Sequence, residues 1–214
     1  MRAKMKDLPY LLFLLMMPAL GFIYKYLNAN PRDAVILSTD LDTLIPFIPV
    51  FIVPYIIWYA FILGYLIYFW YKDISVYLKT LSVIVFGELV CFAIYFYFQT
   101  TVPRPDVAGN GIMVDLVRMI YSHDQPYNAF PSIHVLTTFA IILGNINIRN
   151  KHLFHSVFVP VMGSLIIIST LFVKQHYILD MFGSMFLTSF IYGIVFELYE
   201  LKIADKSNTV YLKE

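Results

Sequence analysis

Six apolar stretches, each close to the length of a membrane-spanning helix, constrain the fold of this chain more than any other feature. A helix that crosses the hydrocarbon core of a bilayer needs about 20 largely apolar residues. The stretches are Leu8–Leu27, Ile45–Tyr71, Thr80–Val102, Ile133–Ile148, Leu153–Val173 and Ile178–Leu201. Only 14% of the residues are charged, whereas soluble domains carry about 25%. The sequence therefore predicts an all-α integral membrane protein, a bundle of six transmembrane helices.

The length of the chain fits one such bundle and leaves no room for a second domain. Residues 1–214 are therefore expected to form a single membrane-embedded domain. A net charge of +1 gives no reason to expect a nucleic-acid partner, and the sequence does not indicate an oligomeric state. The first apolar stretch could also be a cleaved signal peptide, but it is longer than a usual signal core, which favours a retained span.

The distribution of lysine and arginine predicts the orientation of the bundle. With six spans and the amino terminus inside, the outer side holds Lys25, Arg32, Arg104, Arg118 and Lys174. The inner side holds Arg2, Lys4, Lys6, Lys72, Lys79, Arg149, Lys151, Lys202, Lys206 and Lys213. Cytoplasmic segments of membrane proteins carry an excess of these residues, so this orientation is favoured. The compact chain suggests the cytoplasmic membrane of a bacterium.

The segment Tyr127–His134 has the features of an anion-binding helix start. Pro131 suits the first turn of a helix, and an apolar run follows at once. Ser132 and His134 are therefore expected beside the unpaired N–H groups and the positive dipole end of that helix. Such a position binds anions readily.

A second pattern, His176 and Asp180, pairs an imidazole with a carboxylate. Residues four apart on a helix share one face, so the carboxylate could fix the tautomer of the imidazole and raise its basicity. Together with His134 beside an anion site, this pair suggests phosphoryl transfer through a histidine nucleophile.

The six-span topology places these patterns together. Arg104 would end the third span, His134 would open the fourth, and His176 and Asp180 would lie between the fifth and sixth. All four residues would then lie at the outer face. The connection formed by residues 103–128 would lie there as a loop, and a loop of this length is often functional.

Three motifs resemble the signature motifs of the type 2 phosphatidic acid phosphatase superfamily. They are Arg104-Pro105, Pro131-Ser132-Ile133-His134 and His176-x3-Asp180, in the family's order. The second motif, P-S-x-H, is complete. The family's first motif, K-x6-R-P, would place a lysine where this chain has Tyr97, and the third, S-R-x5-H-x3-D, would place an arginine at Thr170. Two phosphate-binding cations of the family are therefore missing.

The missing cations bear on the substrate class. A phosphate monoester carries close to two negative charges at neutral pH and a diester carries one, and buried charges must be paired. A site with fewer cations is therefore better suited to a diester, although Lys174 could replace the missing arginine. The loss of cations also resembles the branch that contains inositol phosphorylceramide synthases and sphingomyelin synthases, which move a phosphorylated head group between lipids.

The resemblance implies a role for each motif residue. His176 would attack phosphorus to give a phosphohistidine, and Asp180 would hold its other ring nitrogen. His134 would protonate the leaving oxygen and then deprotonate the incoming water or alcohol. The phosphate-binding residues would be Arg104, Ser132 and Lys174, with the first amides of the fourth helix. Neither a metal nor another cofactor is expected.

The expected function is a membrane enzyme that cleaves or transfers the phosphate-containing head group of a phospholipid at the outer face. A phosphodiester head-group transferase or phospholipase-like hydrolase is favoured. A monoester phosphatase acting on phosphatidic acid, phosphatidylglycerophosphate or a polyprenyl diphosphate is the enzymatic alternative. The alternative that is not an enzyme is a lipid transporter with a degenerate site. Glu88 in the third span favours it, because intramembrane carboxylates usually face a partner or a cavity.

Overall fold

The computed structural model of the chain describes residues 6–211, with side chains described for residues 6–197. Its elements are η1 (Leu8–Leu15), α2 (Met16–Asn28), α3 (Asp40–Leu44), η2 (Pro49–Phe51), α4 (Ile52–Lys72), α5 (Ile74–Tyr97), α6 (Ile112–His123), α7 (Ile133–Ile146), α8 (Leu153–Phe172) and α9 (Ile178–Tyr211). No strand occurs in the described part of the chain beyond two isolated bridges. The all-α prediction is confirmed there.

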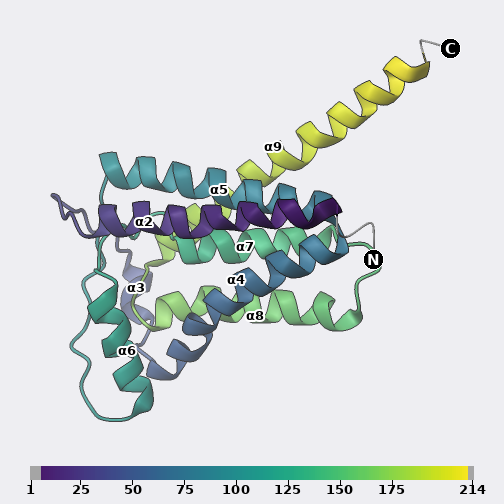
Figure 1. The fold of residues 1–214 in the computed structure, drawn as a ribbon. Coiled ribbons are helices and arrows are strands. Elements are labelled where there is room, and N and C mark those ends of the chain that lie inside the picture. Colours follow the sequence, from purple (N-terminus) through teal and green to yellow (C-terminus); the bar gives the residue numbers. More distant parts are fainter. Residues whose placement is uncertain (1–5, 212–214) are drawn as a thin grey trace.

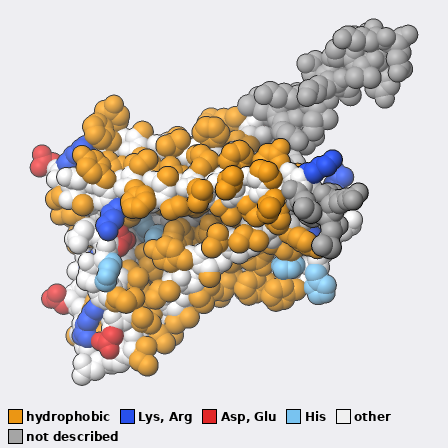
Figure 2. All heavy atoms as spheres, viewed as in Figure 1, with side chains coloured by type: hydrophobic (Ala, Val, Ile, Leu, Met, Phe, Trp, Pro, Cys, Tyr) orange, Lys and Arg blue, Asp and Glu red, His pale blue; other side chains and the backbone are white. Residues whose placement is uncertain are grey.

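Within the described residues, five helical segments are long and apolar enough to cross a membrane. They are Leu8–Asn28, Pro49–Lys72, Ile74–Tyr97, Leu153–Phe172 and Ile178–Glu197. Hydrophobic side chains cover the middle of the visible face, and charged side chains gather toward its two ends (Figure 2). These features indicate a multi-pass membrane protein. The predicted inner cations Arg2, Lys4, Lys202, Lys206 and Lys213 lie outside the described side chains.

The fourth predicted span, α7, is shorter than the others. Its 14 residues extend about 21 Å at 1.5 Å per residue, less than the roughly 30 Å of a bilayer core. It occupies the centre of the bundle, packed against α4, α5, α8 and α9 (Figure 1). Because its neighbours surround it, α7 does not need the full thickness of the membrane. The count of six full spans is therefore not confirmed.

The third predicted span begins earlier than its apolar run. α5 starts at Ile74 instead of Thr80. The carboxylate of Asp73 accepts hydrogen bonds from the backbone N–H groups of Ser75 and Val76 at 2.9 and 3.3 Å. A side-chain cap of this kind satisfies donors that a helix start leaves unpaired. The cap, rather than the apolar run, sets this boundary.

The same span also ends earlier than expected. α5 stops at Tyr97, and the chain then forms isolated bridges from Thr100 to Val35 and from Thr101 to Tyr127. These bridges join the segment after α2 and the segment before α7 to the end of α5. The connection after α2, the connection after α5 and the segment before α7 are thereby held together at one end of the bundle.

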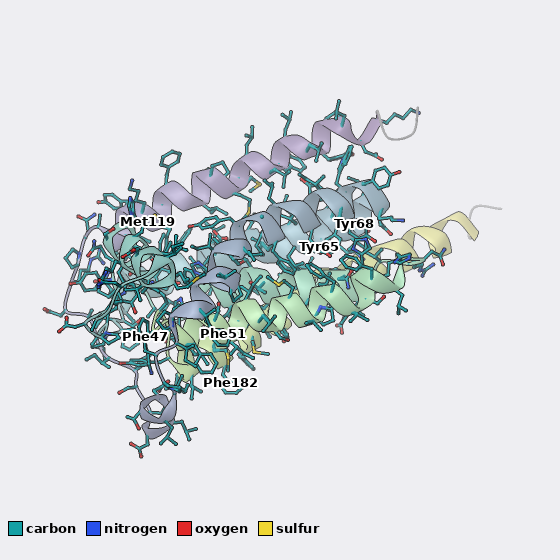
Figure 3. All side chains as sticks on the ribbon, turned by 90° about the horizontal axis from the view of Figure 1, so that it is seen from below. Phe47, Phe51, Tyr65, Tyr68, Met119 and Phe182 are labelled. Atoms are coloured by element: carbon teal, nitrogen blue, oxygen red, sulfur yellow. The ribbon has the colours of Figure 1, made fainter. Side chains whose placement is uncertain are left out.

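The predicted loop of residues 103–128 contains a helix, α6, so that prediction is wrong. Its apolar residues Met113, Leu116, Val117 and Ile120 recur at helical spacing and pack on a small core with Ile52, Tyr55 and Val173. Phe47 and Phe51 join this core, and both lie at the end of the bundle near Met119, away from Tyr65 and Tyr68 (Figure 3). The helix has only 12 residues, too few to be recognised as a membrane-spanning segment.

Replacing Gly144 with alanine should lower the free energy of unfolding by about 1–3 kcal/mol through overpacking. A Cβ atom there would collide with Thr80 Oγ1 and lie 2.9 Å from Phe69 Cε2. Both neighbours are buried. Unfolding of the purified protein in detergent micelles measures the effect. Gly64→Ala in α4 is the control, because no atom lies within 4 Å of its added Cβ. If the two variants lost the same free energy of unfolding, the predicted collision at Gly144 would be contradicted.

Candidate functional site

The beginnings of α7 and α9 meet at the end of the bundle where α6 lies. The backbone N–H of Ser132 donates to the carbonyl of Asp180 at 3.5 Å, which joins the two helix starts. The rings of His134 and His176 are 6.1 Å apart, measured between their centroids. The structure therefore brings the two imidazoles together although they come from different helices.

His176 lies in the turn before α9, not on the helix as its spacing suggested, because α9 begins at Ile178. Its Nδ1 is 3.0 Å from the carbonyl oxygen of Ala129 and 3.5 Å from Asp180 Oδ2. Both neighbours accept hydrogen bonds, so Nδ1 carries the proton of the neutral ring and the lone pair lies on Nε2. Asp180 Oδ2 also accepts from the backbone N–H of Tyr177 at 2.8 Å, which fixes the turn.

His134 lies on the first turn of α7 and is held by aromatic residues of α4. Its ring stacks on Tyr55, with centroids 4.6 Å apart, and lies 4.2 Å from the ring of Trp58. Trp58 Nε1 donates to Thr137 Oγ1 at 2.9 Å and so fastens α4 to α7. His134 Nε2 is buried without a hydrogen-bond partner among the described residues. A buried polar atom without a partner costs about 1–3 kcal/mol, so this atom is suited to meet a bound molecule.

Arg104 reaches the same end of the bundle and is fixed by several contacts. Nη1 donates to the carbonyls of Tyr121 at 3.0 Å and Asp124 at 2.6 Å, and Nη2 donates to Gln175 Oε1 at 2.6 Å. The guanidinium also lies 4.4 Å from the centre of the Tyr121 ring. Its Nε is buried and has no partner within the described part of the chain. The Nε–H group of this firmly held guanidinium therefore has no acceptor among the described residues.

Ser132 is the N-cap of α7. Its side chain is buried, and its hydroxyl oxygen accepts from the backbone N–H of Val135 at 3.3 Å. The helix begins at Ile133, so Pro131 precedes the cap instead of lying in the first turn. Ser132 therefore shapes the helix start, and the first amides of α7 supply the anion-binding feature.

The sequence places Lys174 two residues before His176, but its hydrogen bonds are made to another segment. Its ammonium group donates to the carbonyl oxygens of Asp42, at 3.1 Å, and Ile45. These carbonyls lie at the end of α3, where a cation is favoured by the helix dipole. The structure thus directs Lys174 to α3, not to the imidazole of His176 as a substitute for the missing arginine.

Asp42 is a residue that the sequence reasoning missed. Its Oδ2 accepts from the backbone N–H and the hydroxyl of Thr39 at 2.7 and 2.8 Å, and its Oδ1 accepts from the backbone N–H of Ile178 at 2.8 Å. It therefore caps α3 and holds the first residue of α9, two residues after His176. The spacing of Thr39 and Asp42 is a capping pattern, but no local pattern predicts the contact with α9.

Asp124 contributes a carboxylate to this region. Its Oδ1 accepts from the Tyr24 hydroxyl at 2.9 Å and from Asn28 Nδ2 at 2.6 Å. Burial raises the pKa of Asp124, while the hydrogen bond from Tyr24 and the charges of Arg104 and His176 act in the opposite direction.

The neutral ring of His176 should carry its proton on Nδ1 in the wild-type protein, because both neighbours of that atom are acceptors. Nitrogen-15 NMR of histidine-labelled protein in micelles distinguishes protonated from unprotonated ring nitrogens. The signal is assigned by its loss in His176→Asn. His155, whose Nδ1 lies 3.2 Å from the Tyr65 hydroxyl, is the comparison histidine. A proton found on Nε2 of His176 would contradict the geometry.

One of three comparisons with known proteins identifies a family. The model of the PAP2 superfamily matches residues 46–194, a range that contains every residue from Arg104 to Asp180. No curated protein and no solved structure was found to match the chain. Members of this superfamily are generally phosphatases or phosphotransferases. Because the match covers more than half of the 214 residues, the chain belongs to the PAP2 superfamily.

Proposed function

We propose that the protein is a membrane enzyme that cleaves or transfers the head group of a phospholipid through a phosphohistidine on His176. One observation supports this most. The Nδ1 of His176 is held by Ala129 and Asp180, so its Nε2 is the nitrogen left for phosphorus. His134 lies 6.1 Å away, centroid to centroid, so the two imidazoles are close enough to act on one phosphoryl group.

In the first step, His176 Nε2 attacks phosphorus. The N–P bond forms as the P–O bond to the leaving alcohol breaks, and protonated His134 gives its proton to that oxygen. The imidazolium of His176 that forms is stabilised by Asp180, whose side chain is 1% exposed. Arg104 and the first amides of α7 would stabilise the charge on the phosphoryl oxygens.

In the second step, His134 takes a proton from an acceptor, whose oxygen attacks phosphorus and breaks the N–P bond. Water as acceptor gives hydrolysis, and a lipid or polyol hydroxyl gives transfer. Neither step needs a metal ion, because protein donors meet the developing charge. We place the chemistry at the outer face, where the excess of inner lysine and arginine would orient this end of the bundle.

A phosphodiester is the favoured substrate class. Tyr97, at the position of the family's lysine, is 85% exposed, and Thr170, at the position of the arginine, is fully buried. Neither residue supplies a cation, and Lys174 is bound to α3. With two of the family's cations absent, a singly charged diester is easier to neutralise than a doubly charged monoester. The absence of these cations supports the proposal that the chain belongs near the sphingomyelin synthase-like branch of the superfamily.

Incubation with lipid labelled at phosphorus should leave an acid-labile, base-stable label on the wild-type protein. The probes are mixed micelles that contain phosphatidylglycerol, phosphatidylethanolamine or phosphatidic acid, followed by an alkaline quench. His176→Ala and His176→Asn should lose the label, because neither variant has a nucleophile there. His155→Ala is the matched control and should keep it. A label in the His176 variants, or none on wild type with any of these lipids, contradicts the proposal.

Two further measurements separate the assigned roles. EDTA should leave labelling unchanged, whereas a reversible loss that zinc restores would show that the metal-free mechanism is wrong. His134→Ala should still be labelled by an aryl phosphodiester, whose leaving group needs no proton. It should then release the label slowly, because the base for the second step is missing.

A further inference from the structure

Gln175 is a buried amide that no motif of the sequence selects. Its side chain lies directly before His176 in the chain and the residue is 5% exposed. The backbone N–H groups of Gln175 and His176 both donate to the carbonyl of Thr170, at 3.0 and 3.1 Å. The same turn therefore positions the amide and the imidazole.

The contact with Arg104 fixes the orientation of this amide. Gln175 Oε1 accepts from Arg104 Nη2 at 2.6 Å, and since a guanidinium only donates, the oxygen must face it. The Nε2 group is then a donor that points elsewhere. It is buried without a hydrogen-bond partner among the described residues, as is Arg104 Nε.

Two joined side chains therefore present buried N–H groups with no acceptor. Native proteins pair nearly all buried donors, so the two groups together indicate a ligand with acceptor oxygens. His176 follows Gln175 in the chain, and the contacts of its Nδ1 leave Nε2 for the phosphorus chemistry proposed above. Arg104 brings one positive charge and Gln175 brings none.

We propose that Gln175 and Arg104 together bind the non-bridging oxygens of a phosphodiester, with Gln175 as a specificity-determining residue. This inference rests on the proposed function and names the substrate class of the same site. The neutral amide provides a hydrogen bond without a second positive charge, so the site matches one negative charge better than two. A monoester would bring a second negative charge to a site where, among the described residues, Arg104 is the arginine or lysine that contacts Gln175.

The test measures binding of dimethyl phosphate and methyl phosphate by phosphorus NMR titration of the full chain in detergent micelles at mildly alkaline pH. Wild type should bind dimethyl phosphate more tightly. Gln175→Leu keeps a similar size but removes the donor, and it should weaken dimethyl phosphate by about 10- to 100-fold, the usual worth of a hydrogen bond to a charged group. Gln175→Arg adds a cation and should shift the preference toward methyl phosphate by at least tenfold.

Gln99→Leu is the matched control. Gln99 is equally buried, but its Nε2 donates to Asn128 Oδ1 at 2.9 Å and its Oε1 accepts from the backbone N–H of Arg32 at 2.7 Å. Its substitution should lower thermal stability without changing the ratio of the two affinities. If Gln175→Leu fails to fold, the ratio measured for Gln175→Arg decides.

The inference is overturned if Gln175→Leu binds dimethyl phosphate like wild type, or if Gln175→Arg leaves the ratio unchanged. It is also overturned if wild type binds methyl phosphate more tightly or neither probe at all. Failure of the proposed function gives a different result, namely no phosphohistidine on wild type. A wild-type protein that forms the phosphohistidine while Gln175→Leu binds normally contradicts this inference alone.

Discussion

The hydrogen bond from His176 Nδ1 to the carbonyl of Ala129, at 3.0 Å, is the interaction on which the site depends. It joins the turn before α9 to the segment before α7, which are the two places where the histidines enter the bundle. It also commits one ring nitrogen and so determines which one can react. Asp180 acts on the same nitrogen, and Asp42 holds the start of α9 from the far side. The nucleophile proposed here is thus positioned by the backbone as well as by an acid.

The bundle explains how such a polar site can exist in an apolar protein. α7 is short and central, so lipid-facing helices surround the helix that carries His134. The connections from α2 to α4, from α5 to α7 and from α8 to α9 lie at one end of the bundle, together with α3 and α6 (Figure 1). Arg104, Gln175 and His134 each keep a buried nitrogen atom without a hydrogen-bond partner among the described residues. In a folded chain such atoms carry a cost, and a phosphoryl group bound there would remove it.

Much of this arrangement could be predicted from the sequence, because apolar runs identify spans and the motifs identify their polar ends. Contacts between distant segments could not be predicted. The carbonyl oxygens at the end of α3 bind the ammonium group of Lys174, and the expected contact of this residue with phosphate stays a prediction. The contact between Asp42 and α9 joins residues 136 positions apart, and the role of Gln175 depends on Arg104, 71 positions away. The helix within residues 103–128 is too short and too polar for a span search. No local pattern contains the long-range contacts, whereas the helical spacing of apolar residues between Met113 and Ile120 does indicate α6.

The central claim is that His134 and His176 act on opposite sides of one phosphorus atom. A structure of the wild-type protein with orthovanadate tests it most directly, because vanadate adopts the trigonal bipyramidal geometry of an in-line transfer. We expect vanadium bonded to His176 Nε2, with the opposite apical oxygen hydrogen-bonded to His134 and the equatorial oxygens facing Arg104. Vanadate bound through His134, or bound away from both imidazoles, would contradict it.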